Sequence, residues 1–398
     1  MAILSLFRGK NIKHDSFILF FMGATIKIFF AGDFCSKPST SKIEVSDELK
    51  NLIRSCDLKV VNFEVPLKPD ITLPPQQYER FWQNDDVPDF LRSLGFSLFS
   101  MANNHTFDWG ENGFKKTKAI LGDDSFGAGT YDEAYKVKVI EIDDKKIGFM
   151  ALSYAAYTGV FDDVMRRDGL GCAYINDLRV NHDIIEAKKN IDYLFVLPHD
   201  GIEYIDVPLP ETIARYRDFI DFGADGVIAT HPHCPQGWEE YKGKPIFYSL
   251  GNFLFNSKKG YDYRATNCPH WYEGLCVVMN ISDGYLSWET VNTRNVDNVE
   301  VVIDHDEERN RHNEYLQDLL KDYEKYEFIL QKECKRLTKK MEMPIIDRTQ
   351  HPISLKTEIK KDLRIWMKML RKQCVTDDFS VKTLLRNDTR RSCLLRGI

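Results

Sequence analysis

Two histidines stand one residue apart in the stretch ATHPHCPQGWEEYKGKPIFYSLGNFLF, which runs from Ala229 to Phe255. His231 and His233 follow a short apolar run typical of a buried strand, in a chain with only 10 histidines among 398 residues. Imidazole nitrogens bind transition metals such as Zn²⁺, Mn²⁺ and Fe. Pro232 favours an extended backbone here, so we expect the two imidazoles to point toward two different ions. A pair of hydrogen-bonded loop histidines is the alternative.

Other polar residues with metal-binding atoms stand at the carboxyl ends of further predicted strands. They are Asp33 in FFAGD, Glu64 in VVNFE, His199 in LFVLPHDGIEY, and Asn103, Asn104 and His105 in FSMANNH. Ligands of open α/β sheets bind outside the carboxyl ends of the strands, so these side chains are expected to meet at one edge. Each residue alone has an ordinary structural explanation, such as a turn or a helix N-cap. Together they favour a site for two divalent ions, Mn, Fe or Zn, that activate a water.

The elements that must position these residues alternate between strands and helices up to about residue 250. Strands are expected at Ile26–Ala31, Leu58–Phe63, Ser97–Met101, Lys136–Ile142, Ile147–Leu152, Tyr193–Leu197, Gly226–Ala229 and Ile246–Ser249. Helices are expected at Ser46–Cys56, Val87–Leu94, Gly110–Leu121, Asn176–Asn190 and Pro210–Phe222. This alternation predicts an α/β fold with a parallel or mixed sheet. A hairpin follows at Gly274–Val291, with its turn around Ser282–Gly284.

The character of the chain changes near residue 305, where charged and helix-favouring residues begin. We expect an N-terminal extension over residues 1–24, an α/β domain over 25–304 and a helical C-terminal region over 305–398. Within that region, SLKTEIKKDLRIWMKMLRKQCV predicts a basic amphipathic helix. The segment Gln331–Ile398 has 18 Lys and Arg against 8 Asp and Glu, whereas the whole chain has a net charge of −6. An acidic body therefore carries a basic tail.

The net charge excludes a generally basic nucleic-acid-binding protein, so no nucleic-acid partner is expected. The basic tail can instead pack on the surface of its own domain. It can also dock on anionic lipid, with Ile365, Trp366, Met369 and Leu370 on the apolar side of its helix. An acidic polymer or a partner subunit is the third alternative.

Cysteine usage and the N-terminus bear on location. The 9 cysteines include no CxxC pair, which indicates reduced thiols and a place in the cytoplasm or at the cytoplasmic face of a membrane. The stretch SFILFFMGATIKIFFAG contains Lys27, and its apolar part before this lysine has about ten residues, against about 20 for a spanning helix. A buried strand is favoured, and a signal peptide or anchor is the alternative. Met22 is a second possible start.

The motifs GDF, NFE, MANNHTFDWG, HDGIEY and HPHCPQGWEEYKGKPIFYSLGNFLF resemble, in order and spacing, the CapA family of poly-γ-glutamate capsule biosynthesis proteins. This family lies within the calcineurin-like metallophosphoesterase superfamily, and the similarity covers about residues 25–255. The resemblance implies a metallo-dependent phosphatase-like fold. That fold is an α+β sandwich of mixed sheets flanked by helices, here with a C-terminal helical extension.

The resemblance also implies roles for individual residues. It places Asp33 and His233 on the first metal, Glu64 between the two metals as a bridging carboxylate, and Asn104, His199 and His231 on the second metal. His105 would stabilise the leaving group, and Asp108 would orient His105. Lower-ranked substrate contacts are Asn103, Glu203, Gln236 and Asn252. Cys35 stands where the superfamily usually has a histidine, and a buried structural thiol is favoured there over a soft ligand.

The function implied is that of a protein of bacterial capsule, poly-γ-glutamate or surface-polysaccharide biosynthesis. As an enzyme it would hydrolyse a phosphoester with a metal-activated water, acting on an anionic polymer or a phosphorylated glycan. A peptidase or amidase acting on γ-glutamyl bonds is a weaker alternative. A non-catalytic, polymer-binding or export subunit of a membrane-associated synthase complex, in contact with capsule synthase subunits, is the rival interpretation.

Overall fold

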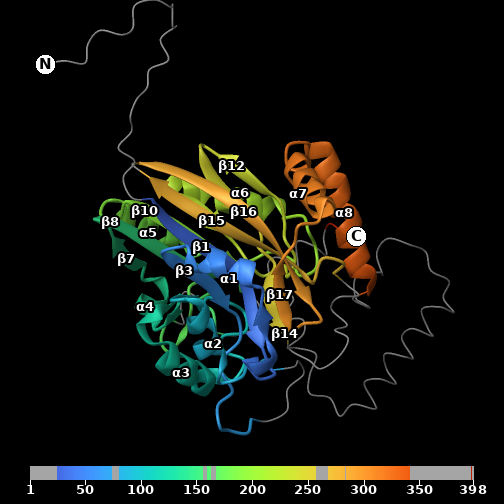
Figure 1. The fold of residues 1–398 in the computed structure, drawn as a ribbon. Coiled ribbons are helices and arrows are strands. Elements are labelled where there is room, and N and C mark those ends of the chain that lie inside the picture. The colour runs from blue at the N-terminus through green and yellow to red at the C-terminus, as the bar shows by residue number, and fades with distance from the viewer. Residues whose placement is uncertain are drawn as a thin grey trace, which may run out of the picture.

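The computed structural model describes residues 25–73, 80–155, 159–162, 167–256, 268–282, 284–340 and 396 (Figure 1). Its larger sheet is nine-stranded and follows the order β2 (Glu44–Val45), β17 (Glu300–Ile303), β16 (Tyr285–Val296), β15 (Glu273–Ser282), β1 (Ile26–Ser36), β3 (Leu58–Phe63), β4 (Leu98–Ser100) and β5 (Ser125–Phe126), with β14 (Asn252–Asn256) also paired to β1. A six-stranded sheet has the order β12 (Trp238–Tyr241), β13 (Lys244–Phe247), β11 (Gly226–Ile228), β10 (Tyr193–His199), β8 (Lys145–Ser153) and β7 (Lys138–Ile142). The strands β6 (Ala128–Gly129) and β9 (Gly171–Cys172) form a small third sheet.

The main core lies between the two large sheets. Successive side chains of a strand point to opposite faces, so every second residue of β1 can face the other sheet. Phe30 on β1 faces the six-stranded sheet, where its ring centroid lies 6.2 Å from that of Phe149 and 5.5 Å from that of Phe195. The preceding residue, Phe29, packs on the other face against Phe96, with 6.1 Å between the ring centroids. The strand therefore contributes to two apolar layers at once.

Helices cover the outer faces of both sheets. They are α1 (Asp47–Arg54), α2 (Val87–Leu94), α3 (Gly110–Leu121), α4 (Tyr131–Tyr135), α5 (Leu178–Lys188), α6 (Pro210–Phe222), α7 (Glu307–Leu319) and α8 (Tyr323–Lys340), with short 3-10 turns at Thr40–Lys42 and Gly122–Asp124. Ile184 of α5 and Phe219 of α6 pack with Leu194 and Val196 of β10 in a second core. The two mixed sheets flanked by helices confirm the predicted fold class.

The central strands place the polar residues of interest at one edge. β1, β3, β4 and β5 run parallel to one another, and so do β8, β10, β11 and β13. Glu64 follows the last residue of β3, His199 ends β10, and Thr230 forms an isolated bridge with His199 just after β11. The carboxyl ends of strands from both sheets therefore meet, as ligand sites of α/β proteins require.

The predicted strand Ile26–Ala31 is too short, because β1 continues to Ser36. Its register shifts around Asp33, so that residue sits at a bulge within the strand instead of after it. Beyond the bulge, β1 pairs with β14 as well as with β3. Bulges commonly re-aim a side chain beside a functional site, and here the bulge carries the Asp33 carboxylate.

The described part of the C-terminal region consists mainly of two helices, α7 and α8. Figure 1 shows these helices, in orange, side by side at one side of the sheets. Leu319, Tyr326 and Leu330 pack against Ile205 and Val207 from the loop after β10. The predicted basic helix at residues 354–375 and the N-terminal extension lie outside the described residues. Within the part of the chain that the structure describes, no helix is long and apolar enough to cross a membrane.

Candidate metal centre

Asp33 is the fully buried centre of a polar cluster at the edge where the two sheets meet. Its Oδ1 accepts a hydrogen bond of 2.7 Å from Asn62 Nδ2, and its Oδ2 accepts one of 3.1 Å from the His231 backbone N–H. Gly32 is required beside it, because a Cβ there would lie 1.9 Å from the carbonyl oxygen of Gly251. The close approach of two backbones thus fixes the position of the Asp33 carboxylate.

Burial raises the pKa of Asp33 from 3.8 to about 7, although hydrogen bonds from Asn62 and the His231 backbone oppose the rise. A buried carboxylate is costly unless a cation or donors offset the lost hydration. A divalent ion at this carboxylate would favour its charged form and would displace its proton.

One group of predicted ligands surrounds Asp33 on the side of β3. Asp33, Glu64 and His233 are all buried and offer ligand atoms within 4.8 Å of one another. His233 Nε2 lies 3.4 Å from Glu64 Oε1, and His233 Nδ1 lies 3.5 Å from Asp33 Oδ2. Two carboxylates and one imidazole form the first predicted ligand group.

The second group joins three elements at the end of β10. His199 Nε2 lies 2.9 Å from Asn104 Oδ1 and 3.1 Å from His231 Nδ1. Burial lowers the pKa of His199 well below its usual value, so this imidazole is neutral near pH 7, as a metal ligand must be. Its other nitrogen, Nδ1, lies 3.0 Å from the Thr230 hydroxyl, the kind of outer contact that orients a ligating histidine.

The chemistry of both groups fits divalent transition metals. The first offers carboxylate oxygen and imidazole, and the second offers amide oxygen and two imidazoles, a mixture that suits Mn, Fe or Zn. In addition, the buried Nδ2 of Asn104 has no hydrogen-bond partner among the described residues, while its Oδ1 faces His199. Asp33 lies 3.7 Å from His199 and 3.5 Å from His233, so it adjoins both groups.

The backbone between the two histidines differs from the prediction that Pro232 would keep it extended. His231 has a φ of 105° and His233 a φ of 59°, both in the left-handed half of the φ range. Non-glycine residues rarely adopt such values, and backbone strain of this kind is often found at functional sites. In this turned backbone, the His231 N–H donates to Asp33 Oδ2.

His105 and Asp108 form a buried pair next to the ligands. His105 Nδ1 lies 2.9 Å from Asp108 Oδ2, which also accepts a 2.7 Å hydrogen bond from the Phe81 backbone N–H. The Phe81 ring stands at 4.7 Å from the His105 ring, centroid to centroid. The carboxylate and the ring together hold one orientation of the imidazole.

The residues predicted as substrate contacts occupy different positions. Asn103 Oδ1 accepts from the His105 N–H, and Asn252 Oδ1 lies 3.0 Å from His233 Nδ1, so both brace histidines of the site. Gln236 is buried, and its Nε2 donates to the Ile205 carbonyl at 2.8 Å. Glu203 is partly exposed in the loop after β10.

The two cysteines nearest the site lie in a small apolar cluster. Cys35 and Cys234 pack with Val65, Phe255 and Trp271. Cys35 is completely buried and does not belong to the ligand group of Asp33. This environment agrees with the structural thiol favoured from the sequence.

Sequence reasoning missed two residues that organise the site. Asn62 Nδ2 lies 2.7 Å from Asp33 Oδ1 and 3.1 Å from His199 Nδ1, so it links the two ligand groups. Trp271 packs on the His233 ring at 5.0 Å between centroids. Asn62 lies in the VVNFE motif, where an amide two residues before the predicted ligand was the available signal. The sequence gives no signal for Trp271, because only the fold brings this residue next to His233.

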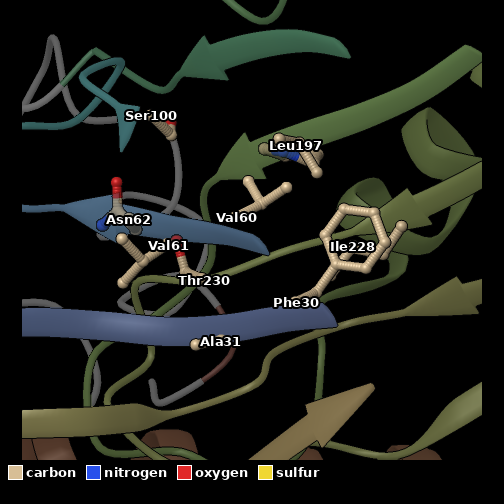
Figure 2. Close-up of a pocket in the computed structure, with 10 residues that line it drawn as sticks. Phe30, Ala31, Val60, Val61, Asn62, Ser100, Leu197, Ile228 and Thr230 are labelled. Atoms are coloured by element: carbon tan, nitrogen blue, oxygen red, sulfur yellow. The ribbon is translucent and has the colours of Figure 1, made fainter. Parts of the chain in front are cut away.

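A small cavity lies between the sheets beneath the ligands. Figure 2 shows Phe30, Leu197 and Ile228 at one end of it and the polar Asn62, Ser100 and Thr230 toward the other. Its volume of about 20 Å³ is close to the space that one water needs, and far below the size of a substrate pocket. The cavity is therefore part of the packing below the site.

Residues 27–257 match the family model described as bacterial capsule synthesis protein PGA_cap. The chain belongs to the bacterial capsule synthesis protein family. This membership confirms the predicted resemblance to CapA proteins. Among similar proteins, the capsule biosynthesis protein CapA of Bacillus anthracis is 28% identical over 226 residues, and the PGA biosynthesis protein CapA of Bacillus subtilis is 30% identical over 212 residues.

These alignments cover 53% of this chain and 53% of the Bacillus anthracis protein, and 52% of this chain and 55% of the Bacillus subtilis protein. This member of the capsule synthesis family thus spans about half the length of the curated relatives it matches. A probable polyglutamine synthesis accessory protein of Mycobacterium tuberculosis is 26% identical over 210 residues, which are 50% of this chain and 55% of that protein.

Solved structures resemble this capsule synthesis family member only distantly. A phosphatase of Mycoplasma pneumoniae matches with a TM-score of 0.39 and 14% identity, over 68% of this chain and 93% of that chain. The sulfate thiohydrolase SoxB of Thermus thermophilus matches with a TM-score of 0.36 and 11% identity, over 67% of this chain and 56% of that chain. The fold class therefore stands on the two sheets and their helices.

Proposed function

We propose that this chain is a metal-dependent hydrolase of phosphoester type that acts in the synthesis of a bacterial capsule, poly-γ-glutamate or another surface polymer. One observation carries the proposal: two groups of ligand side chains adjoin the same buried carboxylate, Asp33. Membership of the capsule synthesis family supports the proposed pathway. The donor atoms of the site support the proposed class of reaction.

Glu64 is proposed as the carboxylate shared between two ions, with Asp33 and His233 on one of them and Asn104, His199 and His231 on the other. Two divalent ions so bound would supply Lewis acidity to a phosphoryl oxygen and lower the pKa of a water. Because these ligands are almost completely buried, their interactions with charge in the site are screened little by solvent.

His105 is proposed to handle the proton of the leaving group. Asp108 Oδ2 lies next to His105 Nδ1, so the Nδ1–H points to the carboxylate and the Nε2 of the imidazolium can donate to the departing oxygen. Asn103 supports this arrangement, because its Oδ1 accepts from the His105 backbone N–H at 3.1 Å. Asp108 acts through His105 and holds its orientation.

The test uses the purified full chain, its measured metal content and a generic phosphodiester such as bis-p-nitrophenyl phosphate. We expect bound Mn, Fe or Zn and a hydrolysis rate that chelation abolishes and added metal restores. His231→Ala should lose bound metal together with hydrolysis. His105→Ala should keep the metal and lose about a hundredfold or more in kcat.

His182→Ala, a change at an exposed histidine of α5, is the matched control and should leave metal content and rate unchanged. A protein without bound metal and without metal-dependent hydrolysis would refute the enzymatic proposal. Unchanged metal content in His231→Ala would refute the ligand assignment.

A polymer-binding role without catalysis is the second candidate, and a cluster near the site favours it. Lys37 and Lys68 each place their Nζ 5.1 Å from the centre of the Trp82 ring. Two cations on one aromatic platform suit an anionic polymer such as poly-γ-glutamate. Under this alternative, Lys68→Ala weakens polymer binding while no metal-dependent hydrolysis is found.

Capsule synthase subunits are proposed as partners, and the cytoplasmic face of the membrane as the place of action. The support is the description of relatives as capsule and PGA biosynthesis proteins, together with the basic composition of residues 331–398. A sedimentation assay of the full chain with vesicles of anionic and of neutral lipid tests membrane contact.

A further inference from the structure

A second cluster of metal-binding side chains lies outside the proposed catalytic centre. Asp206, His270 and His312 offer ligand atoms within 4.8 Å of one another. Asp206 belongs to the loop between β10 and α6, His270 precedes β15, and His312 lies on α7. Three segments far apart in the sequence therefore converge here, one of them in the C-terminal region.

The spacing within this cluster agrees with coordination of one ion. Asp206 Oδ2 lies 3.3 Å from His312 Nε2 and 3.8 Å from His270 Nε2. Ligand atoms about 2.0–2.2 Å from a tetrahedral Zn²⁺ lie roughly 3.3–3.5 Å apart, so small side-chain movements suffice. The three side chains are 22%, 27% and 23% exposed in the order Asp206, His270 and His312, which leaves room for ion entry and for a further water ligand.

Outer contacts of the kind that accompany metal-bound histidines are already in place. His270 Nδ1 lies 2.9 Å from Glu273 Oε2, while its Nε2 is directed to Asp206. Ligating histidines commonly donate their second ring N–H to a carboxylate, which fixes the tautomer and the ring orientation. Glu273 is in turn held by the buried Arg309, whose Nη1 lies 2.8 Å from the same oxygen.

We propose that Asp206, His270 and His312 bind one divalent transition-metal ion, with Zn²⁺ as the best fit to one carboxylate and two imidazoles. The site is separate from the one built on Asp33 and does not depend on the proposed catalytic activity. The proposed ion would link α7 to the loop between β10 and α6 and to the segment before β15.

The proposed ion has a structural role that extends to the edge of the catalytic centre. Trp271 follows His270 and packs on the His233 ring at 5.0 Å between centroids. In the loop of Asp206, the Tyr204 N–H donates to the Pro232 carbonyl at 2.9 Å, between the two ligand histidines. An ion at Asp206 therefore ties together the two segments that flank His233.

The test counts zinc per chain in the full-length protein after metal stripping, reloading with Zn²⁺ and gel filtration. We expect His312→Ala to bind one zinc fewer per chain than the unmodified protein. His305→Ala, a change at a 72% exposed histidine outside the cluster, is the matched control and should bind as many zinc ions as the unmodified protein. An equal count in His312→Ala and the unmodified protein would overturn the proposal.

A second pair of variants guards against misfolding of His312→Ala. Asp206→Asn keeps the shape of the side chain, and Glu273→Gln keeps the contact to His270 while it removes the charge. Glu273→Gln should weaken binding of this one zinc by about 10–100-fold in a calorimetric titration. Asp206→Asn removes the charge of a ligand and should weaken it at least as much, and the circular dichroism spectra of both variants should be unchanged. Undiminished affinity in folded Asp206→Asn would show that the cluster is only a hydrogen-bonded network.

Discussion

Asn62 joins the two candidate ligand groups of the site. Its Nδ2 lies between Asp33 Oδ1 and His199 Nδ1, at 2.7 Å and 3.1 Å. Its Oδ1 lies 3.4 Å from Asn103 Nδ2, which also donates to the Phe63 carbonyl. One amide thus sets the relative position of a carboxylate and an imidazole that come from different sheets.

Asn62→Ala is expected to weaken metal binding by about 10–100-fold, the usual effect of removing an outer contact to a ligand. It should also lower the free energy of unfolding of the metal-free protein by about 1–3 kcal/mol, because buried polar partners lose a hydrogen bond. Calorimetric metal titration and urea unfolding measure the two effects. Asn190→Ala, at an exposed position after α5, is the control, and equal affinities in both variants would contradict this role.

At the scale of elements, the close approach of β1 to the loop before β14 is the most demanding contact. A Cβ on Gly32 would lie 1.9 Å from the Gly251 carbonyl oxygen, and Gly251 itself has a φ of 66°. Strand β1 therefore needs glycine at this point in order to pair with both β3 and β14.

Gly32→Ala is expected to destabilise the protein by more than about 3 kcal/mol, since the clash is with backbone that cannot move aside. It should also displace Asp33 and reduce metal content. Gly284→Ala is the control, because its Cβ meets nothing within 4 Å and only the positive φ of 89° is penalised, at about 1 kcal/mol. Thermal unfolding and metal analysis check both, and similar losses in the two variants would contradict the clash.

An ion pair between α6 and β12 predicts a pH dependence of stability. Burial favours the neutral form of Glu239, but hydrogen bonds from Arg217 and Tyr248 outweigh it and lower the pKa of Glu239 below its usual 4.5. A carboxyl with a lowered folded-state pKa stabilises the protein above its unfolded pKa, and the contribution is lost as the pH falls through the folded value.

Glu239→Gln should therefore lower the free energy of unfolding at pH 7 by about 0.5–1 kcal/mol, which is seen as a lower Tm. The effect is small because the Arg217 side chain is 39% exposed and solvent screens the ion pair. The difference from the unmodified protein should shrink as the pH falls below 4.5. Tm measured at a series of pH values tests this. A difference that is constant with pH would exclude the ion pair as its cause.

The elements best predicted from the sequence carry their own end signals. The bounds of α2 and α6 match the prediction, and both helices have proline in the first turn and glycine after the last. Strands β12 and β14 were missed because they are short and depend on partners elsewhere in the chain. Predicted strands also erred at their ends, as at β1, where the bulge adds pairing that periodicity does not encode.

The convergence of the predicted site residues at one edge was predictable, because parallel strands place their carboxyl ends together whatever the details of the loops. Residues that only the fold brings together were not predictable from the sequence. Examples are Trp271 beside His233 and the cluster of Asp206, His270 and His312. The backbone at His231 and His233 was predicted wrongly: both residues have a positive φ, and the His231 N–H donates to Asp33. The extended conformation favoured next to proline is overridden here by tertiary contacts that the local sequence does not encode.

At the scale of the whole molecule, α7 and α8 pack on the α/β domain through an apolar cluster of their own, formed with the loop after β10. Leu330 of α8 is fully buried with Ile205, Val207 and Leu209. The Tyr326 hydroxyl donates to the Pro208 carbonyl at 2.7 Å. The boundary predicted near residue 305 thus marks a change of composition, while the packing continues across it.

Leu330→Ala is expected to cost about 2–5 kcal/mol of unfolding free energy, the range for a buried leucine that leaves a cavity. Phe328→Ala, two residues earlier at a side chain with 67% exposure, should change stability by less than about 0.5 kcal/mol. Urea unfolding with a single transition would show that α8 unfolds together with the sheets. A separate early transition in Leu330→Ala would show that the helices form an independent unit.

The order of synthesis along the chain determines when the site can form. Asp33 lies near the start of the described chain, while the backbone N–H that it accepts belongs to His231, 198 residues later, and β14 follows further on. During synthesis, the partners of Asp33 are made only after most of both sheets. Contacts between residues so distant in sequence also form slowly. Binding of the proposed metal ions would therefore be one of the last events in the maturation of this protein, and it would report that the two sheets have joined.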